Sequence, residues 1–181
     1  MKKIVIAGGT HCGKTTLIEH YRDAGYPVVA EAAIPIMTRL KDEMGLEEYR
    51  AWRKTNAQEF FEMIEDAQIA NEAAASTDAD FLFLDRGIQD TIVMERYVGV
   101  VPTERALRHA KENRYDLVLI CDTLPEFDGR GDTGRTFTHE DSLKLTELAH
   151  QQYLADGYEP IRIPPVSLEE RIALINKVLS R

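Results

Sequence analysis

The chain has 181 residues and a mass of 20.5 kDa, which suits one domain with an adequate core. Its 22 lysines and arginines against 31 aspartates and glutamates give a net charge of −9, which argues against general binding of nucleic acid. The apolar run near the N-terminus is too short for a signal peptide or a membrane span. Cys12 and Cys121 form no CxxC pair. We therefore expect one cytoplasmic domain, residues 1–181, without a membrane span.

Apolar runs and helical periodicities alternate along the chain. Five strands are predicted, at residues 3–7, 26–30, 81–84, 117–121 and 161–163. Helices are predicted between and after them, at residues 14–24, 36–40, 47–75, 88–97, a short segment from 102, 140–155 and 168–179. Alternation of this kind is typical of an α/β three-layer sandwich, in which helices cover both faces of a parallel five-stranded sheet. Ligands of such sheets bind at the carboxyl ends of the strands.

The strongest motif follows the first strand and matches G-x-x-x-x-G-K-[ST]. It consists of Gly8, Gly9, Thr10, His11, Cys12, Gly13, Lys14 and Thr15, and Thr16 comes directly after it. Such a loop points backbone N–H groups at phosphate oxygens, and the N-terminus of the next helix favours the same anion. We expect Lys14 to reach the β- and γ-phosphates of ATP, with GTP as the alternative, and Thr15 to bind Mg²⁺. Cys12 is interpreted as loop backbone in preference to a catalytic thiol.

Two further strand ends carry charged side chains. Glu31 follows the second strand, and Asp85 and Arg86 follow the fully apolar third strand. A carboxylate at this edge can accept a proton from an attacking hydroxyl or hold Mg²⁺. We assign the metal role to Asp85 and the base role to Glu31, although Glu31 also fits a simple helix N-terminal carboxylate. Arg86 is expected to contact phosphate or, alternatively, to pair with an acidic neighbour such as Asp90.

Two more segments are candidates for contact with nucleotide or acceptor. Residues 123–138 form a loop rich in Gly and Asp, and Arg130 and Arg135 in it would supply positive charge to a migrating phosphoryl group if the loop acts as a lid. A solvated surface loop is the alternative, and the two arginines are not ranked. On the predicted helix 47–75, Gln58 and Phe61 are candidates for an acceptor pocket, although aromatic residues there also fit plain core packing.

Several segments together resemble the ribosylnicotinamide-kinase-like P-loop family, whose small ATPase or kinase domains often carry only an AAA-type description. They are Gly-Gly-Thr-x-x-Gly-Lys-Thr-Thr-Leu, Val-Val-x-Glu-Ala, Leu-Asp-Arg-Gly-x-x-Asp-Thr, Asp-Gly-Arg, Gly-Tyr-Glu-Pro and Ser-Leu-Glu-Glu-Arg. The chain is more distantly similar to the deoxynucleoside kinases. That second resemblance implies a nucleoside-kinase-like P-loop NTPase fold with Glu31 as base, an Asp85–Arg86 pair, lid arginines and a base-pairing glutamine at Gln58. A further arginine of that family has no counterpart in the acidic stretch after Gln58.

Two functions fit these residues. The first is Mg-ATP-dependent phosphoryl transfer to a small hydroxylated, nucleoside-like acceptor, in which Lys14, Glu31, Asp85, Arg86 and a lid arginine act. The second is a regulatory ATPase or GTPase switch without a small acceptor. The chain has no Asn-Lys-x-Asp segment of the kind that reads guanine, which argues against a Ras-type switch and favours ATP.

Overall fold

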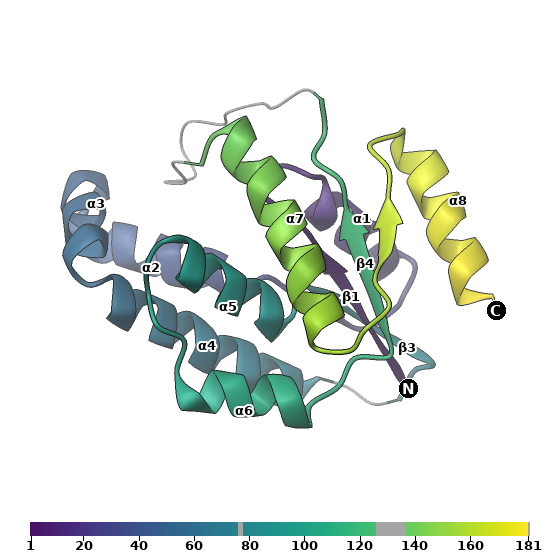
Figure 1. Cartoon of the computed structure of the whole chain (residues 1–181), viewed down its shortest axis with the longest axis horizontal. Helices are drawn as coiled ribbons and strands as arrows, with labels where there is room; N and C mark the ends of the chain where they lie inside the picture. The colour runs from purple at the N-terminus through teal and green to yellow at the C-terminus, as the bar shows by residue number, and fades with distance from the viewer. Residues whose placement is uncertain (76–77, 126–136, 181) are drawn as a thin grey trace.

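The computed structural model describes residues 1–75, 78–125 and 137–180. Its centre is a sheet of five parallel strands in the order β2-β3-β1-β4-β5, drawn edge-on among the helices in Figure 1. The strands are β1 (Lys2–Ala7), β2 (Val28–Val29), β3 (Phe81–Asp85), β4 (Leu117–Cys121) and β5 (Ile161–Ile163). The predicted five-stranded parallel α/β fold is confirmed, and the second strand is shorter than expected.

Eight helices are present in the described part of the chain. They are α1 (Lys14–Asp23), α2 (Ala33–Met44), α3 (Leu46–Thr55), α4 (Ala57–Ala74), α5 (Ile88–Tyr97), α6 (Glu104–Glu112), α7 (His139–Ala155) and α8 (Leu168–Leu179). The single long helix predicted over residues 47–75 is wrong, because Asn56 separates α3 from α4 and its side chain bonds back to the carbonyl oxygen of Trp52. Pro35 lies in the first turn of α2 instead of interrupting it, since proline is tolerated there.

The buried sheet residues separate into two faces because successive side chains of a strand point in opposite directions. Ile4 and Ile6 of β1 pack with Leu17 of α1 and Ile175 of α8 on one face. On the other face, Val5 and its neighbours pack around aromatic side chains that include those of Tyr115, Tyr153 and Tyr158. Figure 1 shows α1 and α8 on one side of the sheet and α5 and α7 on the other. These layers match the predicted sandwich.

The strand order places the functional edge of the sheet. β1 lies between β3 and β4 in the sheet. The strands β2 and β3 lie on one side of β1, and β4 and β5 lie on the other, so the strand order reverses at β1. Ligands of open α/β sheets bind beyond the carboxyl ends of the strands at such a switch point. The glycine-rich loop leaves β1 at that point.

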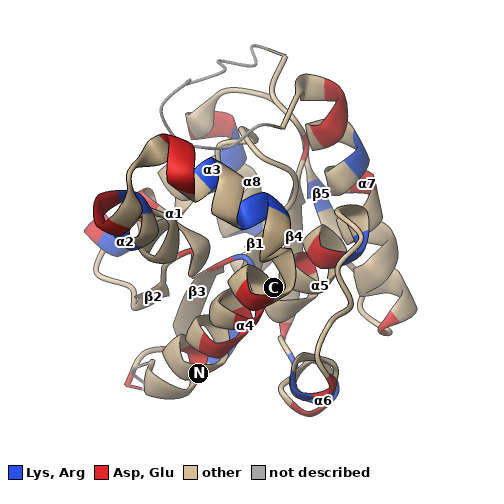
Figure 2. Ribbon diagram, turned by 90° about the vertical axis from the view of Figure 1, so that its left-hand side faces the viewer, with Lys and Arg blue, Asp and Glu red and all other residues tan. Residues whose placement is uncertain are grey.

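Charge on the described surface is mixed. In Figure 2 α4 carries acidic positions only, α7 carries acidic and cationic positions, and further cationic positions lie on other helices such as α3. Along residues 1–75, 78–125 and 137–180, no helix combines the length and the apolarity needed to cross a bilayer.

Candidate nucleotide site

The phosphate loop connects β1 to α1 as the motif requires. Gly13 has a φ of 72°, a left-handed conformation that glycine adopts without strain, and it immediately precedes α1. Lys14, the first residue of α1, is only 5% exposed. Its ammonium nitrogen donates to the carbonyl oxygen of Gly9 at 2.5 Å. The cation therefore lies across the loop that is expected to bind phosphate.

The far side of the loop rests on α7 and β4. The hydroxyl of Ser142 donates to the carbonyl oxygen of Thr10 at 2.5 Å, and the backbone N–H of Gly9 donates to the hydroxyl of Thr146 at 2.9 Å. Thr123, just after β4, joins both hydroxyls at 3.0 and 3.3 Å. These buried polar contacts fix the loop backbone while leaving other N–H groups to meet an anion.

Gly9→Ala is expected to destabilise the protein by about 1–3 kcal/mol, because an added methyl would overpack this contact. A Cβ at Gly9 would lie 2.3 Å from the backbone oxygen of Ser142. Gly45→Ala is the comparison variant: Gly45 has a φ of 82° and no described atom within 4 Å of an added Cβ, so it reports the strain of a left-handed position, which Gly9 does not occupy. Urea unfolding measures both variants. A free energy of unfolding of Gly9→Ala equal to that of the wild type would contradict the contact argument.

Arg86 connects the loop to the end of β3. It has an unusual positive φ of 77° and is 7% exposed. Its guanidinium donates to the carbonyl oxygens of Gly8 at 2.7 Å and Gly9 at 3.4 Å. Its Nε also lies 3.4 Å from a carboxylate oxygen of Glu31. Burial lowers the pKa of Arg86, but the surrounding carboxylates outweigh burial and raise it, so this side chain is a permanent buried cation.

Asp90, in the first turn of α5, is the acidic counterpart of Arg86. One carboxylate oxygen accepts from the backbone N–H of Gly8 at 3.3 Å and lies 3.5 Å from Arg86. The other oxygen accepts from the backbone N–H of Gly87 at 3.1 Å and from the hydroxyl of Tyr153 at 2.7 Å. The pairing of Arg86 with Asp90, which the sequence analysis gave as the alternative, is therefore present, and the predicted contact of Arg86 with phosphate stays a prediction.

Thr15 and Asp85 form the candidate metal site. The Thr15 hydroxyl donates to Asp85 Oδ2 at 3.0 Å, and Oδ1 of the same carboxylate is buried with no hydrogen-bond partner among the described residues. Burial is the main cause that raises the pKa of Asp85, and Lys14 opposes it. A divalent cation would satisfy the unpartnered oxygen and favour the ionised form. The two residues therefore fit Mg²⁺, which prefers oxygen ligands and keeps phosphate and water in its remaining positions.

Cys12 is buried within the loop, where its thiol donates to the carbonyl oxygen of Gly9 at 3.2 Å and accepts from the ammonium group of Lys14 at 3.3 Å. Hydrogen bonding with the Cys121 thiol lowers the pKa of Cys12 to about 5, aided by Lys14 and opposed by burial. Its carbonyl oxygen accepts from Arg171 of α8 at 2.8 Å. Because the thiol is 0% exposed, this arrangement agrees with the interpretation of Cys12 as part of the loop structure and not as a nucleophile.

A small cavity of about 30 Å³ lies beside the phosphate loop, between α2, α4 and α5. Glu31, Phe61 and Arg86 are among its lining residues, together with Gln68 and Asp90. Its volume holds about two water molecules. The structure thus brings the proposed base, the strand-end arginine and one of the two candidate pocket residues together, in a closed arrangement.

Gln58 lies elsewhere and is not among the lining residues of that cavity. Its amide nitrogen donates to Glu62 and to the carbonyl oxygen of Val101, and the side chain is exposed. Gln68, ten residues later on α4, is the glutamine that the cavity contains, and it is 2% exposed. The predicted role of Gln58 in an acceptor pocket therefore stays a prediction, and this cavity gives it no support.

The lid arginines fall outside the described residues. Arg130 and Arg135 both belong to residues 126–136, so their predicted roles stay predictions. After that segment, α7 begins with a capping box: the Thr138 hydroxyl accepts from the N–H of Asp141, whose carboxylate accepts from the N–H of Thr138 in return.

Sequence reasoning missed most of the polar residues that hold the loop from distant elements, and it considered Asp90 only as a partner of Arg86. The missed residues are Thr123, Ser142, Thr146, Tyr153 and Arg171, all 7% exposed or less. Those of these residues that lie on helices could have been suspected from the sequence, because a polar side chain at a core position of an amphipathic helix needs a buried partner. The identity of that partner depends on the tertiary structure and could not be predicted.

Comparisons with family models and with solved structures place the chain among known folds. A family model described as an AAA domain matches residues 3–171. A structure of deoxyadenosine kinase from M. mycoides with bound dATP superimposes with a TM-score of 0.66 at 16% identity and covers 100% of both chains. A second structure of that enzyme, with products dCMP and a flexible dCDP bound, gives a TM-score of 0.65 at 15% identity over 98% of each chain. No curated protein matches the chain.

These matches confirm the expected similarity to P-loop kinases and ATPases and, in fold, to the deoxynucleoside kinases. At 15–16% identity the similarity to these solved structures shows only that the fold is shared. The residues of the site are therefore argued from their own geometry.

Proposed function

The chain belongs to the AAA domain family. From this starting point we propose that it transfers the γ-phosphoryl group of ATP to a small hydroxylated, nucleoside-like acceptor. The observation that carries this proposal is the position of Glu31. Its carboxylate lies 3.4 Å from Arg86, whose guanidinium in turn contacts the carbonyl oxygens of the phosphate loop. A candidate base thus lies beside the place where a γ-phosphate would end.

Each group has a role that follows from its chemistry. Lys14 neutralises charge on the β- and γ-phosphates, and the loop N–H groups orient the chain of phosphates. Thr15 and Asp85 would hold Mg²⁺, which would supply positive charge to offset that of the phosphates. Glu31 accepts the proton of the acceptor hydroxyl as its oxygen attacks. Arg86 holds that carboxylate in place while it is bound to the loop.

The lining of the small cavity suits an acceptor with a flat apolar body and polar edges. Phe61, Ile64 and Met94 offer apolar surface, and Gln68 and Thr91 offer hydrogen-bonding groups. Its volume of about 30 Å³ does not admit such a molecule, so α2 or α4 has to move outward on binding.

The small size of this cavity favours a second candidate function. A regulatory ATPase or GTPase switch needs no room for an acceptor, and the cavity that the described residues form beside Glu31 has a volume of only about 30 Å³. In that case Glu31 and Arg86 would hold the loop in one state and report the presence of nucleotide to a protein partner.

Glu31→Gln separates the two functions. ATP consumption is measured with Mg²⁺ against a panel of nucleosides and ribosides. A kinase is expected to be stimulated strongly by one acceptor, and the variant to lose about 10²- to 10⁴-fold of that stimulated rate, because its amide cannot accept the proton. Glu19→Gln on α1 is the matched control, since Glu19 is exposed. Turnover that stays equally low with every acceptor, and is unchanged in Glu31→Gln, would favour the switch.

A further inference from the structure

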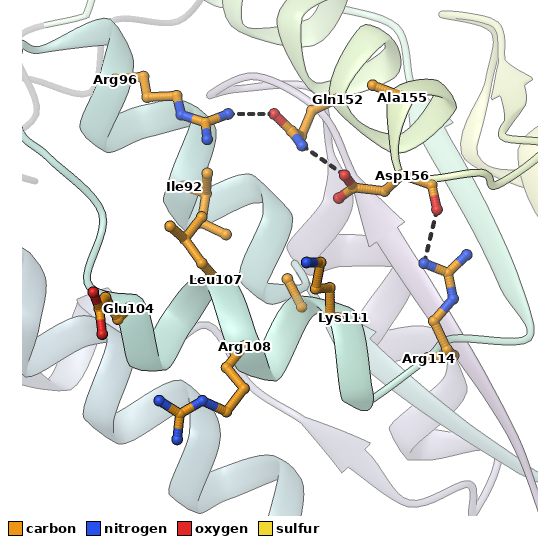
Figure 3. Close-up of a pocket in the computed structure, with 11 residues that line it drawn as sticks. Ile92, Arg96, Glu104, Leu107, Arg108, Lys111, Arg114, Gln152, Ala155 and Asp156 are labelled. Atoms are coloured by element: carbon orange, nitrogen blue, oxygen red, sulfur yellow. Dashed lines mark hydrogen bonds between the residues drawn. The ribbon is translucent and has the colours of Figure 1, made fainter.

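A second and larger hollow lies away from the phosphate loop. It has a volume of about 730 Å³ and is bounded by α5, α6 and the C-terminal end of α7 (Figure 3). It shares no lining residue with the small cavity beside Glu31. We call it the α6 groove. Its volume falls in the range of pockets that take small organic ligands, about 300–1,000 Å³.

The α6 groove is cationic although the whole chain carries a net charge of −9. Four basic side chains line it, against two carboxylates; the basic ones are Arg96, Arg108, Lys111 and Arg114. All four come from a short stretch of chain that includes α6, so the local field is positive within an acidic protein. Such a pocket raises the local concentration of an anion.

Two of the four basic side chains are fixed by hydrogen bonds to neighbouring residues, and two form none within the described part of the chain. Arg96 donates to the side chain of Gln152 at 2.6 Å, and Arg114 donates to the backbone oxygen of Asp156 at 2.8 Å (Figure 3). Arg108 and Lys111 are exposed, and neither forms a hydrogen bond or ion pair within the described part of the chain. Two pre-positioned cations beside two unpaired ones form a set of donors suited to a phosphate group.

The lining also includes an apolar part. Ile92 of α5, Leu107 and Ala110 of α6, and Ala155 of α7 contribute to it. Leu107 is 39% exposed, so apolar surface faces the solvent beside the cations. A ligand that carries only charge would leave this surface wet, whereas one with an apolar or aromatic portion would bury it.

We propose that the α6 groove binds a phosphorylated small molecule that carries an apolar or aromatic group. The phosphate binds at Lys111, whose side chain points toward α7 in Figure 3, and Arg108, which points away from α7 there, turns inward to reach it. The apolar portion lies on Leu107 and Ile92. A hollow of this volume between three helices favours a small ligand over an acidic protein segment, which would need a broader face. The proposal does not depend on the kinase function.

The test compares two double variants by calorimetry, with AMP and inorganic phosphate as probes, at about 0.15 M salt so that loose surface attraction is screened. In Arg108→Ala/Lys111→Ala the AMP affinity of the groove is expected to fall at least tenfold. Both positions are exposed on a helix, where alanine is well accepted. Arg22→Ala/Lys177→Ala removes the same charge from α1 and α8 and is expected to keep full affinity. AMP is expected to bind several-fold more tightly than phosphate.

Lys14→Ala distinguishes AMP binding at the groove from AMP binding at the phosphate loop. In this variant, AMP is expected still to bind at the groove even if the phosphate loop no longer binds nucleotide. Three results would overturn the proposal. One is AMP binding that the groove variant leaves unchanged. Another is an equal loss in the Arg22 and Lys177 control, which would mean nonspecific charge attraction. The third is binding of an acidic peptide at the groove without binding of AMP or phosphate, which would assign this surface to a protein partner.

Discussion

Alanine in place of Lys14 is expected to lower nucleotide turnover about 10²- to 10³-fold, which is the loss seen when one preorganised charge stabiliser is removed. The ammonium group is buried at the start of α1 and donates to the loop carbonyl of Gly9 at 2.5 Å. No neutral side chain at that position can offset charge that moves onto the phosphates. The measurement is the rate of ATP hydrolysis or transfer under saturating Mg²⁺, with nucleotide affinity determined in parallel.

Lys54→Ala is the matched control for this loss, because Lys54 lies exposed on α3, away from the phosphate loop. Circular dichroism and thermal unfolding show whether the Lys14 variant keeps its fold. Wild-type turnover and affinity in a folded Lys14→Ala protein would reject the phosphate-loop assignment, and the roles given to Glu31, Asp85 and Arg86 with it.

The parts of the site that follow from local sequence were predicted well. A strand, a glycine turn and a helix are set by neighbouring residues, so the phosphate loop could be placed from its motif. The apolar run before Asp85 located that carboxylate at a strand end, and the structure puts it 3.0 Å from the Thr15 hydroxyl. Alternation of strands and helices was enough for the parallel sheet.

The parts that depend on distant contacts were not predicted. The break at Asn56 turns α4 away from α3, and helical periodicity alone did not reveal it. Gln58 was chosen from its place on the predicted helix and from the family resemblance, and which glutamine of α4 faces the cavity, namely Gln68, depends on how α4 packs. Asp90 was considered only as a partner of Arg86, whereas its contacts with Gly8 and Tyr153 join residues 82 and 63 positions apart. No local pattern encodes such pairs.

Asp90→Asn is expected to reduce the free energy of unfolding by about 3 kcal/mol, in the range for breaking a buried charge pair by removing one partner. The carboxylate is 2% exposed and accepts from two backbone N–H groups, one of them that of Gly8, and from the hydroxyl of Tyr153. An amide replaces one acceptor oxygen with a donor, so at least one of these donors loses its partner. The change also leaves Arg86 with less compensating charge in a buried position.

Urea unfolding measures this loss, and Asp42→Asn provides the comparison because Asp42 lies exposed on α2. A domain has about 5–15 kcal/mol of stability in total, so the expected loss is a large share of it. Tyr153→Phe removes a single donor to the same carboxylate and is expected to cost about 1–2 kcal/mol, less than Asp90→Asn. If Asp90→Asn cost no more than Asp42→Asn, the carboxylate would not be the group that holds the phosphate loop against α5 and α7, and the rigidity on which nucleotide binding depends would have to come from Ser142 and Thr146 instead.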